Sequence, residues 1–119
     1  TPTRILFEHL HENERLYKIL LNSRGGEAAL ARLKNFLVQK ITGSFAVVAH
    51  EPRPVIPDEV IAVHLVSAQI GLGIWWLENG RPYPLEYMVE LAHWLSFSGA
   101  YQALGFSTAG LPAPEHPPA

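Results

Sequence analysis

The stretch from Val60 to Leu77 constrains the fold most, because it is apolar on nearly every side when drawn as a helix. A helix that faces water on one side shows an apolar stripe, whereas one that is apolar all round is buried all round. A chain of 119 residues offers little interior in which to hide such a helix. We therefore expect a second subunit to cover part of it.

This stretch belongs to a helix expected over residues 57–78, which begins at a proline and two acids and ends before Asn79-Gly80. At 100° per residue it has three apolar sides, so it needs three neighbours. Small residues would let another helix approach closely. That helix could come from the same subunit or from a partner across a twofold axis. The small residues are Ser67, Ala68, Gly71 and Gly73.

Three further helices are expected, over about 3–21, from 27 onward and over about 84–104. Residues 45–49 could continue the second helix or be extended. Three prolines make residues 51–57 a loop. Residues 1–106 would form one domain and 107–119 a Pro-rich flexible tail. The fold class is all-α: a four-to-five-helix bundle whose last two helices form an intersubunit four-helix bundle in a homodimer.

The last expected helix supports a dimer, because aromatic side chains lie on the flank that should be wet. Aromatic residues are enriched at the cores of interfaces. Two helices from each chain would build a twofold-symmetric bundle. Alternatively, the Pro-rich tail or the loop from Pro52 to Pro57 covers Phe97. The predicted interface residues are Gln69, Leu72, Gly73, Trp76, His93, Phe97, Ala100 and Tyr101.

Polar groups also occur within apolar faces. His9, Asn13 and Tyr17 follow one another at four-residue spacing on the first helix, and buried polar groups need partners. These residues could line a mostly apolar effector cavity with a few placed polar groups. Alternatively, each polar group is satisfied locally, and Lys40 extends to water. The predicted ligand-binding residues are His9, Asn13, Tyr17, Phe36, Lys40 and His64.

Composition and spacing argue against several other functions. The chain has no cysteine, a net charge of −2 and no Lys/Arg run, so disulfides and nucleic-acid binding by these residues are not expected. No histidine pair has the spacing of metal ligands on one helical face. Motifs of nucleophilic or phosphate-binding enzymes are missing too. We expect no metal, no cofactor and no enzymatic activity. No apolar run reaches 18 residues, so a cytoplasmic protein is expected.

Three segments resemble the C-terminal domain of TetR-family transcriptional regulators. Residues 11–21 (HENERLYKILL) are similar to its opening helix, and residues 68–80 (AQIGLGIWWLENG) with 84–88 (PLEYM) resemble its last two helices. The resemblance covers roughly residues 5–106. It implies a homodimeric regulatory domain that binds a small apolar or amphipathic effector. In that family, a helix-turn-helix head that binds DNA precedes the domain. The chain starts at Thr1 and lacks such a head, so DNA would be bound only by the full-length parent. The alternative hypothesis is a stand-alone helical adaptor that binds another protein and not DNA.

Overall fold

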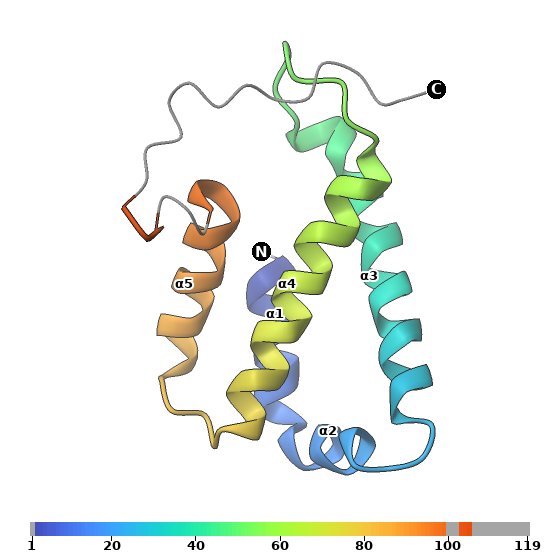
Figure 1. The fold of residues 1–119 in the computed structure, drawn as a ribbon, viewed down its shortest axis with the longest axis vertical. Coiled ribbons are helices and arrows are strands. Elements are labelled where there is room, and N and C mark those ends of the chain that lie inside the picture. The colour runs from blue at the N-terminus through green and yellow to red at the C-terminus, as the bar shows by residue number, and fades with distance from the viewer. Residues whose placement is uncertain (1, 100–102, 106–119) are drawn as a thin grey trace.

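The chain folds into helices. The computed structural model describes residues 2–99 and 103–105, and within them there are five helices and no strand. Figure 1 shows α4 crossing the middle of the molecule, with α3 on one side, α5 on the other and α1 behind it. The all-α class predicted from the sequence is confirmed. The helices are α1 (Pro2–Glu12), α2 (Glu14–Leu21), α3 (Gly26–Val48), α4 (Asp58–Glu78) and α5 (Leu85–Ser98).

The first predicted helix is divided in two at Asn13. The Asn13 side-chain amide donates to the carbonyl of His9 at 3.0 Å, and its backbone lies at φ −116° and ψ 30°. Asparagine side chains compete in this way for backbone groups that a continuous helix would use. The backbone amide of Tyr17 still donates to the carbonyl of Asn13 at 3.1 Å, so α2 follows directly after a bend.

α3 settles the conformation of residues 45–49, which the sequence left open: the helix continues to Val48, and Ala49 is extended. Phe45 is buried there in a cluster with Val38 on the same helix and with Ala62 and Val66 on α4. At the other end, a Cβ on Gly26 would collide with the carbonyl oxygen of Leu20, so the turn from α2 into α3 needs a glycine.

α5 ends earlier than the expected boundary near Leu104. Its last residue is Ser98, and Gly99 follows at φ +84°, a backbone conformation that favours glycine. The amide of Gly99 closes the helix by donating to the carbonyl of Leu95 at 2.8 Å. α4 begins at Asp58, directly after Pro57, and ends at Glu78, as predicted.

The interior consists of two apolar clusters that both use α4. One lies between α3 and the first half of α4. The other joins α1, α5 and the second half of α4 around Trp76, which is 1% exposed. The Trp76 ring packs edge-on against Phe7 with centroids 5.7 Å apart, and its indole N–H donates to the carbonyl of Tyr83 at 2.8 Å. α4 is therefore the central helix of the subunit.

Candidate functional site

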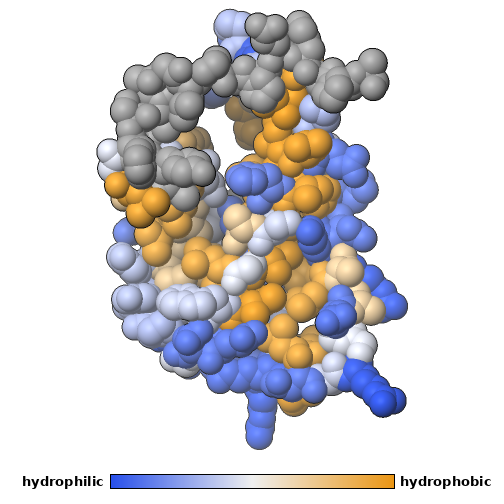
Figure 2. Space-filling view, viewed as in Figure 1, coloured by the Kyte–Doolittle hydropathy of each residue, from blue (hydrophilic) through white to orange (hydrophobic). Residues whose placement is uncertain are grey.

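The side of α4 that faces away from both clusters is open and largely apolar. Only 28% of the most apolar 18-residue window of α4 is buried within the subunit. By length and composition alone this helix could cross a membrane, although core helices of soluble proteins pass the same test. Figure 2 shows apolar side chains gathered along it. We call this surface the α4 face; its residues are Val60, Val63, Ser67, Gly71 and Trp75, all exposed except the half-buried Ser67.

Aromatic rings extend the apolar surface onto the neighbouring turn and α5. Trp75 stacks on Tyr83 with centroids 6.5 Å apart, and Tyr83 contacts Tyr87 at 5.3 Å. Farther along α5, the Phe97 side chain is 80% exposed and lies 4.7 Å from the His93 ring. Exposed apolar surfaces of this kind are typical of binding sites for other molecules.

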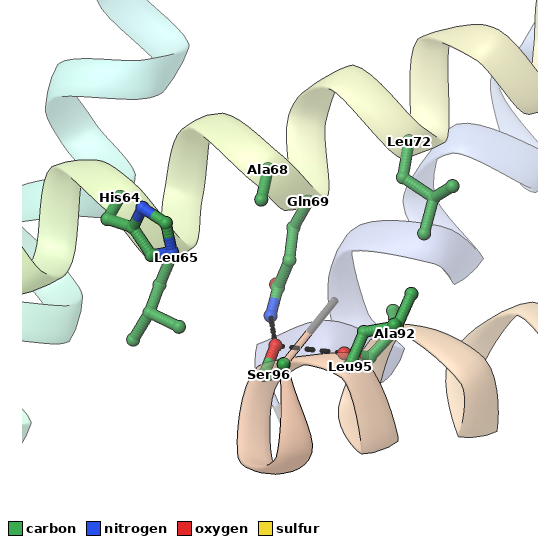
Figure 3. A pocket seen from close by; sticks show the side chains of 9 residues that line it. His64, Leu65, Ala68, Gln69, Leu72, Ala92, Leu95 and Ser96 are labelled. Carbon is green, nitrogen blue, oxygen red and sulfur yellow. Dashed lines mark hydrogen bonds between the residues drawn. The ribbon is translucent and has the colours of Figure 1, made fainter. Parts of the chain in front are cut away.

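A cleft of about 360 Å³ separates α4 from α5 beside this face. Figure 3 shows Gln69 reaching across it, where the side-chain amide donates to the Ser96 hydroxyl at 3.3 Å. That hydroxyl in turn donates to the carbonyl of Ala92 at 2.8 Å. Small side chains on α5 leave the space open. The lining residues are His64, Leu65, Ala68, Gln69, Leu72, Ala92, Leu95, Ser96 and Gly99.

The residues predicted for the dimer interface fall into four pairs. Gln69 and Leu72 line the α4–α5 cleft, and His93 and Phe97 are exposed on α5. Gly73 and Trp76 belong instead to the interior of the subunit. A Cβ on Gly73 would meet the Leu10 side chain of α1, so this glycine allows two helices of one chain to approach. The remaining two predicted residues, Ala100 and Tyr101, lie outside the described residues.

The predicted ligand-binding residues do not meet in one cavity. The Tyr17 hydroxyl is 2.7 Å from His9 Nδ1, so these two polar groups satisfy each other, and burial raises the pKa of Tyr17. Asn13 bonds to the backbone. Phe36 and Lys40 are exposed on α3, with the ammonium 5.5 Å from the ring centre. His64 lies apart from them in the α4–α5 cleft.

A polar cluster that sequence reasoning missed ties α2 to the turn between α4 and α5. Arg81 donates to His11 Nδ1 at 2.6 Å and forms an ion pair with Glu14 at 3.0 Å. Lys18 contacts the other oxygen of Glu14 at 2.9 Å. The hydrogen bond from Lys18 and the charge of Arg81 hold the pKa of Glu14 below its usual range. Glu14 and Lys18 are four residues apart on one helix, but Arg81 comes from a distant part of the sequence, so no local pattern indicates its place in the cluster.

Ionisable groups in the described part of the chain offer no metal centre, since no group of three His, Asp or Glu side chains could hold an ion there. Apart from Tyr17, whose pKa is raised by burial, the groups with shifted pKa values in the described residues belong to ion pairs. One such pair is Arg4–Glu86, where the bidentate hydrogen bonds at 2.7 and 2.8 Å lower the pKa of Glu86. These ionisable groups therefore do not form a site of their own, and the candidate binding surfaces are the α4 face and the α4–α5 cleft.

Together, the helical fold and the open face of its central helix define an all-α domain with an exposed apolar surface. The family model for the C-terminal region of transcriptional regulators matches residues 3–97, and the chain belongs to this TetR-type family. No curated protein matches, nor does any solved structure. The resemblance noted in the sequence is thereby confirmed.

Proposed function

We propose that this chain is the dimerisation and effector-binding domain of a TetR-family regulator, and that α4 and α5 pair with the same helices of a second copy. The single observation that carries the proposal is the α4 face, an apolar surface on a helix of which little is buried in the subunit. Soluble proteins rarely leave such a surface uncovered. Membership in a regulator family supports a protein partner in the cytoplasm over a lipid one.

In a twofold dimer, both copies contribute the same surface to the interface, so one apolar face per subunit is sufficient. The small side chains of Ser67 and Gly71 at its centre allow two α4 helices to come close together. Rows of exposed apolar and aromatic side chains on both sides would supply the buried area. DNA binding would be the task of another part of the regulator. An effector would act by favouring one arrangement of the two subunits, and a coupling of about 1–3 kcal/mol is typical.

The test places a charge at the centre of the α4 face. Nothing lies within 4 Å of a Cβ added at Gly71, so Gly71→Arg should leave the subunit folded. Burying its unpaired charge between two copies is costly, and we expect this variant to be monomeric. Gly43→Arg is a matched control, since Gly43 is another exposed helical glycine with open space around it, on α3. Light scattering should give twice the chain mass of 13.2 kDa for the wild type and the control.

A second pair of variants tests the share of α5. Phe97→Glu should weaken the dimer, whereas Phe36→Glu, at a 57% exposed phenylalanine on α3, should not. If Phe97→Glu remains dimeric, Phe97 is not part of the interface. If the wild-type chain is monomeric at high concentration, the proposed homodimer is wrong, and a surface for a different protein takes its place.

A further inference from the structure

We propose that the α4–α5 cleft binds a small uncharged amphipathic molecule, an apolar chain or ring that carries a carbonyl or hydroxyl oxygen. The size of the cleft, the chemistry of its walls and the hydrogen bond that crosses it support this assignment. Binding itself needs only one subunit, whereas its regulatory consequence rests on the dimer proposed above.

The size of the cleft favours a small molecule over a partner helix. Its volume of about 360 Å³ falls in the range of small-molecule sites, roughly 300–1,000 Å³. A helix about 10 Å across that rises 1.5 Å per residue would fill this volume with roughly one turn. A second copy of α5 can therefore lie over the cleft but not inside it.

The walls select an apolar, uncharged ligand. Leu65, Ala68 and Leu72 on α4 face Ala92 and Leu95 on α5, so both sides of the cleft are mainly carbon. Among the described residues that line it, none is a lysine, arginine, aspartate or glutamate. A charged molecule would lose its hydration there without gaining an ionic partner, which is unfavourable.

The polar end of the ligand has a defined partner in Gln69. The bond from the Gln69 amide to Ser96 is 3.3 Å long, beyond the usual range for an N–H···O bond. Ser96 already directs its own proton to the carbonyl of Ala92 at 2.8 Å. A ligand oxygen at an ideal distance would therefore be a better acceptor for Gln69. Figure 3 shows the His64 ring on the same side of the cleft, where it can contact the ligand.

The competing cavity between α2 and α3 fits less well. It measures about 140 Å³, and its lining is apolar apart from Tyr17. The Tyr17 hydroxyl is already paired with His9 at 2.7 Å, so it has less to offer a ligand. Size and hydrogen-bonding capacity both favour the α4–α5 cleft.

Occupation of the cleft would act on the neighbouring α4 face. The Gln69–Ser96 bond connects the two helices across the cleft. A ligand that takes the Gln69 amide exchanges this connection for its own contacts with both walls, so α5 can shift relative to α4. If the two copies pair through these helices, the shift changes how the subunits are arranged.

The experiment titrates the 119-residue chain, labelled with ¹³C at its alanine and leucine methyl groups, with 2-octanone. We expect saturable shifts at Ala68, Leu72 and Leu95 and none at Leu30 or Leu33 in the α2–α3 cavity. Octanoate and octylamine, which have similar chains and a charge, should bind at least tenfold more weakly. No shifts up to the solubility limit, shifts confined to the α2–α3 leucines, or equal binding of all three compounds would overturn the proposal.

Variants link binding to the cleft. Ala68→Phe should abolish the shifts by filling the cleft, while Ala31→Phe, at an exposed alanine on α3, should leave them unchanged. Gln69→Leu should weaken 2-octanone about five- to tenfold, as expected for one lost hydrogen bond. Unchanged affinity in Ala68→Phe would contradict the assignment. Sedimentation of the same samples separates the two proposals, because a monomer that binds refutes only the dimer and a dimer that does not bind refutes only the cleft.

Discussion

Replacing Trp76 by phenylalanine tests the central role of α4 in the subunit core. The indole is 1% exposed, packs against Phe7 and donates to the carbonyl of Tyr83 at 2.8 Å. Loss of that hydrogen bond costs about 1 kcal/mol. The smaller ring also leaves a void, which we put at about 1–2 kcal/mol because complete truncation of a buried Trp costs 3–5 kcal/mol. The expected loss of unfolding free energy is therefore about 2–3 kcal/mol, a large part of the 5–15 kcal/mol typical of a domain.

The assay is urea unfolding followed by far-ultraviolet circular dichroism, with both substitutions made in the Gly71→Arg background, which is expected to be monomeric, because dimer formation through the α4 face would add to stability. Trp75→Phe is the matched control, since Trp75 is the adjacent residue but is 44% exposed. Its stability should change by less than about 0.5 kcal/mol. Equal losses for the two variants, or a larger loss for Trp75→Phe, would refute the assignment of Trp76 to the core and Trp75 to the α4 face.

Other substitutions test individual contacts. Gly43→Ala should raise the free energy of unfolding by about 1 kcal/mol, because alanine favours the helix and has open space there. The free energy of unfolding of Gly73→Ala should be about 1–3 kcal/mol lower than that of Gly43→Ala, because the added methyl group displaces the Leu10 side chain. Thermal unfolding compares the two variants. Tyr17→Phe should lose about 1 kcal/mol at neutral pH. Because burial raises the pKa of Tyr17, the wild-type advantage is complete below pH ~10 and declines as pH rises through the folded value, which unfolding at pH 8 and 11 would detect. Glu86→Gln should lower the melting temperature slightly at low salt, and salt should screen out this effect. Because the ion pair lowers the pKa of Glu86, the difference in melting temperature between wild type and variant should vanish as the pH falls through the pKa of the folded carboxyl.

The sequence predicted the features that depend on local chemistry. Pro57 followed by acids marks the start of α4, and Asn79-Gly80 follows its end. Because α4 has apolar residues on every side, we expected that the other helices of one subunit would not cover it completely. Its low burial within the subunit agrees with this. These features follow from residue type and helical period, which need no knowledge of the rest of the fold.

The sequence did not predict where a helix bends, which neighbour each helix face contacts, or which distant segments meet. The first helix bends at Asn13, whose side-chain amide bonds to the carbonyl of His9, and an asparagine in the sequence does not by itself indicate such a bend. The helical wheel placed Trp76 on an apolar side but could not say whether that side faces α1 or another subunit. His9 and Tyr17 share a face as predicted, yet their mutual hydrogen bond becomes evident only from the three-dimensional distance. Contacts between distant segments, such as Arg81 with Glu14, leave no periodic pattern.

The two glycines of α4 show how one helix can serve two purposes. Gly73 is buried and gives Leu10 room, so a side chain there disturbs the core, whereas Gly71 lies in open space, so a side chain there can disturb only what another molecule brings to the α4 face. Because the same helix also forms one wall of the cleft, a change in its position reaches both surfaces at once. An effector in the cleft would not need to unfold any core contact. It would need only to favour one position of α5 against α4, and a difference of about 1.4 kcal/mol would change the balance between two subunit arrangements tenfold.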